Sequence, residues 1–145
     1  MPNADELVAE ARRHLQRLTP GAAADALADG ALLVDIRPLH QRRRDGEVPG
    51  AVVIGRNVLE WRLDPGGEHS IPEAADGTSV VVFCEQGFAS SLAARSLQIL
   101  GWRDATDVIG GFDAWVADGL PVRPCAGATA EESGSTGEEA LDQTG

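Results

Sequence analysis

Short apolar runs alternate with amphipathic, helix-like patterns along most of this 145-residue chain. Each apolar run is about four to six residues long, which is typical of strands buried on both faces of a parallel sheet. The runs that we expect to form strands are 31–36, 51–54, 79–83 and 105–109. Strands that alternate with helices predict an α/β fold built on a parallel sheet.

Helical spacing of apolar residues, together with start and stop signals, predicts the helices around these runs. Thr19 and Pro20 provide an N-cap followed by proline at the first helical position, and Gly30 is placed to end that helix. The predicted helices cover about 4–17, 20–28, 57–63, 90–100 and 112–117. Residues 40–45 are expected to form a polar surface segment, and residues 64–77, rich in Pro and Gly, mostly a loop.

These patterns divide the chain into three parts. Residues 1–17 are expected to form an N-terminal helix packed on the domain, and residues 18–124 the domain itself. Residues 125–145 are rich in Ala, Gly, Ser, Thr and Glu without any periodicity, so they are expected to form a disordered acidic tail.

The formal net charge of −11 argues against nucleic acid as a partner, since a phosphate backbone would be repelled. No apolar stretch approaches the roughly 20 residues of a membrane-spanning helix, and the polar start of the chain lacks the pattern of a secretory signal. Two cysteines in such a chain indicate a reducing compartment. We therefore expect a soluble, cytoplasmic monomer that contacts neither membrane nor nucleic acid.

Cys84 is the residue most indicative of chemistry. It follows the run 79–83 directly and precedes the helix predicted to begin at Ser90, so its thiol should lie between a strand end and a helix N-terminus. Backbone N–H groups converge at such a place and stabilise a thiolate, the reactive form of cysteine. Gly87 permits the unusual backbone turn that would bring these groups inward. A structural cysteine, buried as a small apolar residue, is the alternative, but the polar loop that follows favours a catalytic role.

Other chemistries find less support in the sequence. The three histidines, His14, His40 and His69, lie in a helix and in polar loops, so a histidine base for Cys84 is not indicated. Neither the histidines nor the two cysteines have the spacing of metal ligands, and no cofactor is expected. Cys125 stands at the edge of the predicted tail and is expected to be incidental, with a resolving thiol for oxidised Cys84 as the lesser alternative.

Four segments in order resemble the signatures of the single-domain rhodanese-like (sulfurtransferase) family. The resemblance covers about residues 18–122, nearly the whole predicted domain. The segments are an apolar strand ending in Asp35-x-Arg37, the stretch 46–51, the loop 84–90, and Gly110-Gly111-Phe112 followed by Trp115, Gly119 and Pro121.

The resemblance implies a rhodanese-like fold, with a central parallel sheet of about five short strands and helices on both faces. It also implies that sulfane sulfur moves from a donor, thiosulfate or a persulfide, to a thiophilic acceptor through a persulfide on Cys84. The acceptor would be cyanide, a low-molecular-weight thiol or a protein. Asp35 and Arg37 would brace the loop and the neighbouring strands, with a position of Arg37 at the pocket mouth as the alternative. The residues implied to bind substrate are Glu85, Gln86, Gly87, Phe88, Ala89 and Ser90.

Departures from the family pattern affect the expected substrate. Ala89 stands where the family loop often has arginine, and Glu85 adds a negative charge beside Cys84, so weaker binding of thiosulfate and a preference for an uncharged or protein persulfide are expected.

Two other functions are weighed against sulfur transfer. A cysteine-based phosphatase needs an arginine six positions after its cysteine, where this chain has Ser90. A non-catalytic or redox-sensing interaction module is the second alternative.

Overall fold

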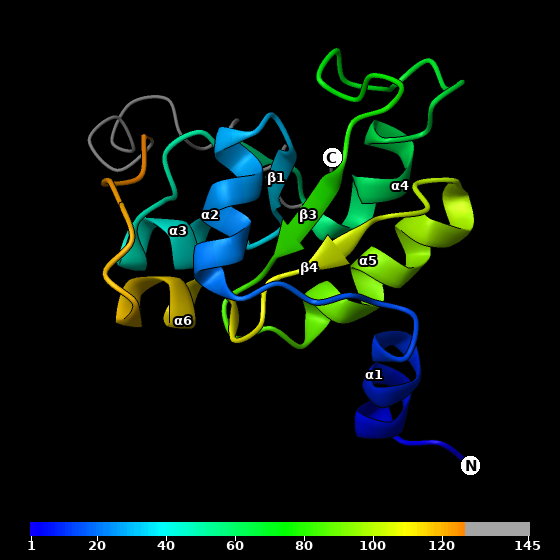
Figure 1. Ribbon diagram of the computed structural model, residues 1–145, viewed down its shortest axis with the longest axis horizontal. Coiled ribbons are helices and arrows are strands. Elements are labelled where there is room, and N and C mark those ends of the chain that lie inside the picture. Colours follow the sequence, from blue (N-terminus) through cyan, green and yellow to red (C-terminus); the bar gives the residue numbers. More distant parts are fainter. Residues whose placement is uncertain (127–145) are drawn as a thin grey trace.

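A four-stranded parallel sheet of order β2-β1-β3-β4 lies at the centre of the computed structural model, which describes residues 1–126 (Figure 1). Every neighbouring pair of strands is parallel, which confirms the predicted α/β class. Beside β4, Leu18 forms a single parallel bridge with Val108. The strands are β1 (Leu32–Asp35), β2 (Val52–Val53), β3 (Val80–Phe83) and β4 (Thr106–Asp107).

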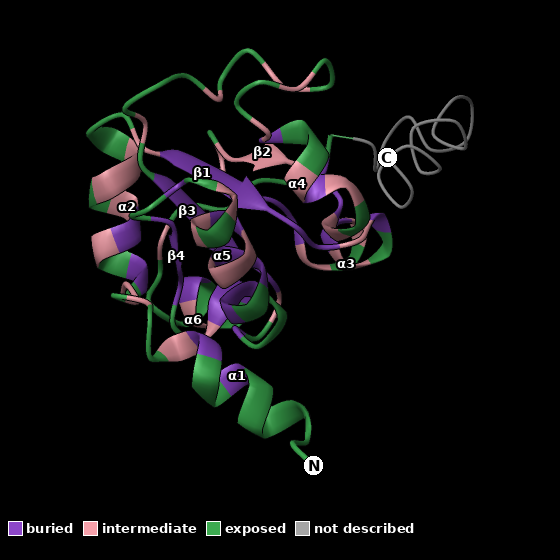
Figure 2. Cartoon of the chain, turned by 90° about the vertical axis from the view of Figure 1, so that its right-hand side faces the viewer, coloured by how far each residue is buried: buried purple, intermediate pink, exposed green. Residues whose placement is uncertain are grey.

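Alternate residues of the central strands face two separate cores. Val80, Val82 and Cys84 belong to one core, whereas Val81 and Phe83 belong to the other. This period of two is the geometry of a strand, and burial on both faces explains why the runs are apolar throughout. Figure 2 shows β1, β3 and β4 as buried segments between the helices. Each fully buried Val or Leu side chain stabilises the fold by about 1.5–3 kcal/mol relative to an exposed one.

Helices cover both faces of the sheet (Figure 1). Residues of α4 and α5 complete the first core, and residues of α2 and α6 complete the second. A short 3₁₀ helix, η1, precedes α4. The helices are α1 (Ala4–Arg12), α2 (Pro20–Ala28), α3 (Leu39–Asp45), η1 (Arg56–Val58), α4 (Leu59–Arg62), α5 (Ala89–Leu100) and α6 (Gly111–Ala117).

Helix α1 ends at Arg12, five residues before the predicted end at 17. The residues that follow leave the helix because they bind the edge of the sheet instead. The Gln16 carbonyl accepts a hydrogen bond from Thr106 Oγ1 at 2.9 Å, and the Leu18 N–H donates to the Asp107 carbonyl at 3.0 Å. Tertiary pairing therefore outweighs the helical periodicity of this segment.

The polar surface segment predicted at residues 40–45 is helical, and one of its residues, Arg42, is buried. These residues belong to helix α3, in which Leu39 and Arg42 are buried, with exposures of 1% and 2%. Arg42 can be buried because its Nη1 pairs with Glu47 Oε2 at 2.9 Å, and a buried cation needs such a partner. Strand β2 also differs from the prediction, since it is half-buried at the sheet edge.

Most of the predicted tail, residues 127–145, lies outside the described residues. The first two residues of that prediction are described, and of these Cys125 is buried. Among the described helices, none combines the length and apolarity that crossing a membrane requires.

Candidate active site

Two backbone amides point at the Cys84 sulfur. The N–H of Gly87 donates to Sγ at 3.2 Å, and the N–H of Ser90, in the first turn of α5, donates at 3.3 Å. The residue is 9% exposed, so the sulfur is largely surrounded by protein but opens into a pocket. Donors of this kind stabilise negative charge on sulfur without a charged side chain.

The beginning of α6 holds the loop in this shape. The N–H of Phe112 donates to the Cys84 carbonyl at 2.8 Å, and the N–H of Asp113 donates to the Glu85 carbonyl at 3.0 Å. The Cys84 and Glu85 carbonyls therefore point towards α6, whereas the Gly87 and Ser90 amides point towards the sulfur. Gly111 has a φ of +61°, and a Cβ there would lie 2.4 Å from the Cys84 carbonyl oxygen. In the sequence, the only sign of this close approach between Gly111 and the loop is the pair of glycines at 110 and 111, directly before the predicted helix.

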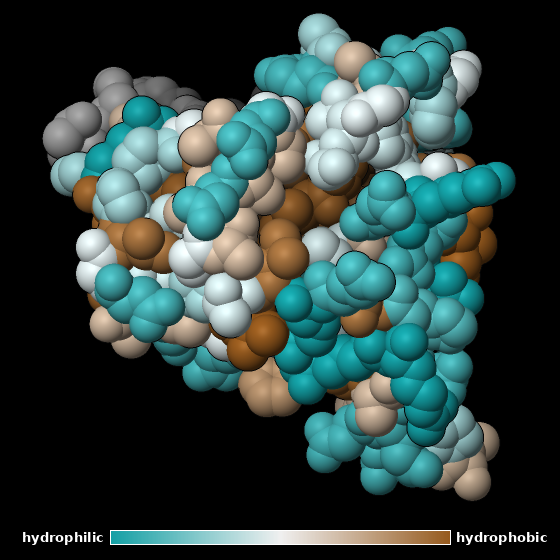
Figure 3. All heavy atoms as spheres, viewed as in Figure 1, coloured by the Kyte–Doolittle hydropathy of each residue, from teal (hydrophilic) through white to brown (hydrophobic). Residues whose placement is uncertain are grey.

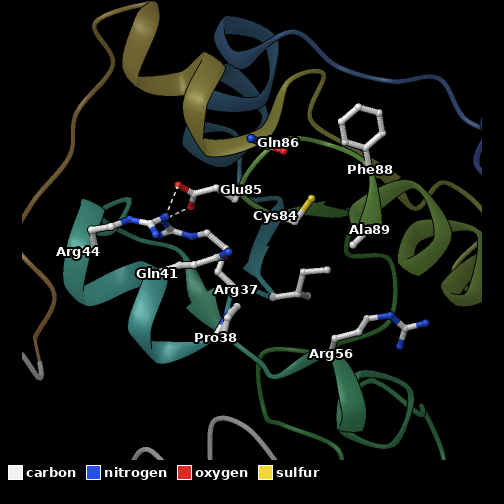
Figure 4. A pocket seen from close by; sticks show the side chains of 11 residues that line it. Arg37, Pro38, Gln41, Arg44, Arg56, Cys84, Glu85, Gln86, Phe88 and Ala89 are labelled. Carbon is white, nitrogen blue, oxygen red and sulfur yellow. Dashed lines mark hydrogen bonds and ion pairs between the residues drawn. The ribbon is translucent and has the colours of Figure 1, made fainter. Parts of the chain in front are cut away.

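A pocket of about 510 Å³ opens over Cys84 (Figure 4). Its volume falls within the range of about 300–1,000 Å³ typical of small-molecule sites. Side chains from the ends of β1 and β3 and from α3, η1 and α5 surround it. The lining residues are Ile36, Arg37, Pro38, Gln41, Arg44, Arg56, Cys84, Glu85, Gln86, Phe88 and Ala89. Of the six loop residues predicted to bind substrate, Gly87 and Ser90 direct their amides at the sulfur, and the other four, Glu85, Gln86, Phe88 and Ala89, line the pocket.

Each nitrogen of the Arg37 guanidinium donates a hydrogen bond. Its Nε and Nη2 donate to the Asp35 carboxylate, Nη2 also donates to the Gly46 carbonyl at 2.8 Å, and Nη1 donates to Glu85 at 3.1 Å. The guanidinium carbon lies 3.8 Å from the ring centroid of Phe112. Burial by itself would lower the pKa of Arg37, but the hydrogen bonds and charges of Asp35 and Glu85 outweigh it and raise the pKa. The structure thus places Arg37 between the end of β1 and the loop that carries Cys84.

The negative charge of Glu85 is offset by Arg37, which the sequence indicated, and by Arg44, which it did not. Glu85 pairs with Arg37 and also with Arg44 of α3, at 3.3 Å. Burial, followed by the neighbouring Asp45 carboxylate, raises the pKa of Glu85, and the charge and hydrogen bond of Arg37 oppose that rise. In Figure 4, Arg44 and Glu85 lie on one side of the Cys84 sulfur.

Arg56 lies on the other side of the sulfur in this view, together with Ala89 (Figure 4). Its Nη1 is held by Glu60 at 3.0 Å, and Glu60 also accepts a hydrogen bond from Ser96 Oγ at 2.6 Å. Burial alone would raise the pKa of Glu60, but the hydrogen bonds from Ser96 and Arg56 outweigh it and keep the pKa below its usual value. The pocket therefore has cationic side chains even though position 89 lacks one.

None of the three histidines lines the pocket, and each is exposed.

Cys125 differs from the expectation of an incidental thiol at the edge of a tail, because it is 4% exposed and its Sγ lies 3.5 Å from Glu47 Oε2. Burial would raise the pKa of Glu47, but hydrogen bonds led by Arg42 outweigh it and lower the pKa. Within residues 1–126, Cys84 and Cys125 are both free thiols, so no disulfide joins them.

A family model described as a rhodanese-like domain matches residues 19–118. An adenylyltransferase and sulfurtransferase, MOCS3-2 of Zea mays, is 38% identical over 93 residues, which are 64% of this chain but 19% of that protein. Thiosulfate sulfurtransferase GlpE of Haemophilus influenzae is 30% identical over 109 residues, covering 74% of this chain and 93% of the relative. The chain thus spans about a fifth of the maize protein and almost all of the Haemophilus one.

A solved structure from Rhodopseudomonas palustris is also similar to this chain. It belongs to a protein of unknown function described as a possible tyrosine phosphatase, and it superposes with a TM-score of 0.79 at 29% identity. The superposition covers 85% of this chain and 96% of the other.

Proposed function

Because the chain belongs to the rhodanese-like domain family, we propose that it is a sulfurtransferase that carries sulfane sulfur as a persulfide on Cys84. The family match confirms the resemblance predicted from the sequence and the parallel α/β fold that accompanies it. The observation that carries the proposal is the convergence of the Gly87 and Ser90 amides on Sγ at the base of a pocket.

In the first step, the Cys84 thiolate attacks the outer, sulfane sulfur of the donor. With thiosulfate, a new S–S bond forms to Cys84, the S–S bond of thiosulfate breaks, and sulfite leaves with the bonding electron pair. The negative charge then resides on the terminal sulfur of the persulfide. The Gly87 and Ser90 amides donate to Sγ, so they are suited to stabilise the thiolate charge that Sγ carries before this step.

In the second step, a thiophilic acceptor takes the terminal sulfur. Cyanide attacks that sulfur, the S–S bond of the persulfide breaks, and thiocyanate and the Cys84 thiolate are released. A thiol acceptor follows the same course and gives an acceptor persulfide. No histidine base is needed in either step, because both nucleophiles react as anions.

The residues around the sulfur have distinct proposed roles. Gly87 and Ser90 hold the charge on sulfur through their amides, while the side chains of Gln86, Phe88 and Ala89 shape the pocket. Glu85 lies at the pocket wall in contact with Arg37, which with Asp35 braces the loop. The pocket is large enough for a small sulfur-containing anion or a low-molecular-weight persulfide, and a protein acceptor could present its thiol at the opening.

The direct test is to supply purified protein with thiosulfate and cyanide and to measure thiocyanate. We expect turnover, with no activity in the Cys84→Ser variant and full activity in Cys125→Ser. Mass spectrometry after exposure to donor alone should show an addition of about 32 Da, one sulfur atom, on the Cys84 peptide. If no donor, thiosulfate or organic persulfide, produces this addition, the chain is a non-catalytic or redox-sensing module instead.

The similarity to the Rhodopseudomonas protein raises phosphatase activity as a second candidate. A phosphatase loop needs an arginine to bind the phosphoryl group, six positions after the cysteine. Ser90 occupies that position, and its hydroxyl donates to the buried Asp107 at 2.8 Å instead of facing the pocket. We therefore expect no hydrolysis of p-nitrophenyl phosphate above that of the Cys84→Ser variant.

A further inference from the structure

Two arginines contact the active-site loop from its rear. Arg12, the last residue of α1, donates from Nη2 to the Gly87 carbonyl oxygen at 2.8 Å, and Arg17 donates from Nη2 to the same oxygen at 3.0 Å. Both arginines precede residue 19, where the rhodanese-like match begins. The Gly87 N–H is one of the two donors to the Cys84 sulfur, so these contacts act on the residue that orients it.

A buried carboxylate makes this arrangement possible. Two guanidinium groups at one carbonyl repel each other unless a negative charge lies close by. Asp107 is fully buried at the end of β4, and Arg17 donates to its Oδ1 at 2.8 Å and its Oδ2 at 3.2 Å. Arg12 joins the same network through Ser91, whose Oγ accepts from Arg12 Nε at 3.0 Å and donates to Asp107 Oδ2 at 2.8 Å.

The network also reaches the second amide donor. Ser90, whose N–H donates to the sulfur, donates its own hydroxyl to Asp107 Oδ2 at 2.8 Å. Both amides that face Cys84 are thus anchored from behind, Gly87 by the two arginines and Ser90 by Asp107. None of Arg12, Arg17 and Asp107 lines the pocket over Cys84.

The N-terminal segment is firmly placed. Val8 and Ala11 of α1 are buried, and α1 packs against α5. Gln98 of α5 donates to the His14 carbonyl at 2.9 Å, and Leu18 pairs with β4. The rest of the helix, at the lower right of Figure 3, presents a mostly hydrophilic surface. The segment therefore reaches the loop as an ordered part of the domain.

We propose that Arg12 and Arg17 are positioning residues for sulfur transfer, so that the active site is incomplete without the segment that precedes the matched domain. This inference rests on the proposed function. The Gly87 carbonyl belongs to the peptide unit that follows the Gly87 N–H. By holding this carbonyl on the far side of the loop, the arginines limit rotation about Gly87 and so keep its N–H directed at the sulfur. Their effect is therefore on the charged states of the Cys84 thiolate and persulfide rather than on the entry of the donor.

The test compares Arg12→Met with Arg13→Met. Arg13 is the next residue, is exposed, and pairs only with Glu10 among the described residues, so its substitution controls for the loss of one charge. We expect Arg12→Met to lower kcat for thiosulfate about tenfold, since a charged donor to the loop is lost, with KM for thiosulfate changed less than about twofold. Arg12→Lys, which keeps one donor for the Gly87 carbonyl, should recover part of the rate.

A second measurement separates this proposal from the proposed function. The rate at which iodoacetamide alkylates Cys84, followed on the Cys84 peptide by mass spectrometry, needs no sulfur donor. We expect the Arg12→Met rate to fall several-fold below that of Arg13→Met at neutral pH, because fewer oriented amides stabilise the thiolate. If the wild type transferred no sulfur, the proposed function would fail while the alkylation comparison still tested the positioning.

Arg17 requires a gentler change, because Arg17→Met would leave Asp107 buried with hydroxyl partners alone and could unfold the protein. Arg17→Lys keeps a cation for Asp107 and should slow alkylation with little change in the urea midpoint. Alkylation rates equal to that of Arg13→Met in both Arg12→Met and Arg17→Lys would overturn the proposal. A loss of sulfur transfer with unchanged alkylation would overturn it too, since the arginines would then act elsewhere.

Discussion

Replacing Gly111 with alanine should disable Cys84 although Gly111 does not line the pocket. A Cβ at this position would lie 2.4 Å from the Cys84 carbonyl oxygen, 2.8 Å from the Glu85 carbonyl oxygen and 2.8 Å from the Gly87 nitrogen. All three are backbone atoms of the active-site loop, so none can move away by a change of rotamer. Either the loop or the start of α6 must shift, and the amides that face the sulfur shift with the loop.

The cost of this substitution has two parts. Alanine at a φ of +61° costs about 1–2 kcal/mol. Relief of the clash also separates Phe112 and Asp113 from the carbonyls to which they donate, at about 0.5–1.5 kcal/mol for each hydrogen bond. The total is about 2–5 kcal/mol of unfolding free energy. Misplacement of the amides by about 1 Å should lower kcat about a hundredfold in addition.

Gly119→Ala is the matched control. Gly119 has a φ of +74°, but no atom lies within 4 Å of a Cβ built there, so this variant has the left-handed backbone cost without the clash. Urea denaturation gives the difference in stability, and thiocyanate formation and Cys84 alkylation give the difference in function. If Gly111→Ala matched Gly119→Ala in all three measurements, the contact between α6 and the loop would not be what shapes the site.

Two further predictions concern the charges around the pocket. An ordinary glutamate has a pKa of about 4.3. Because the pKa of Glu85 is raised above its ordinary value, its carboxylate is protonated at a higher pH as the pH falls from about 7 towards about 4.3. KM for thiosulfate should therefore decrease over this range in the wild type but stay nearly constant in Glu85→Gln, and parallel profiles would refute the assignment. Arg56→Met should raise KM for thiosulfate about fivefold through loss of a charged contact, whereas Arg62→Met, an exposed residue outside the pocket, should leave it unchanged.

The strands and the loop that carries Cys84 could be predicted because their signals are local. The run at 79–83 is apolar since both of its faces are buried, and Cys84 follows it at the place where a parallel strand meets its helix. The N-cap at Thr19 is similarly local, and its hydroxyl does accept a hydrogen bond from the Ala22 N–H. Such features need only a few consecutive residues.

The missed features depend on partners far apart in the sequence. From the sequence alone, Arg42 is expected at the surface, because nothing local shows that Glu47 pairs with it inside the protein. Arg44 and Arg56 lie 40 and 28 positions from Cys84, and no local pattern connects them to the pocket. The pair Arg17 and Asp107 is separated by 90 positions. For the same reason, the cationic character of the pocket was underestimated from the loop sequence alone.

The bridge at Leu18 also bears on how the protein behaves in solution. Strand β4 ends the sheet on one side and is only two residues long. Leu18 donates to the Asp107 carbonyl at 3.0 Å and accepts from the Ile109 N–H at 2.8 Å, so it occupies backbone groups that would otherwise be open to another chain. Unpaired strand edges promote aggregation. A chain shortened to begin at Thr19 would therefore expose an edge available for self-association as well as lose the two arginines behind Cys84.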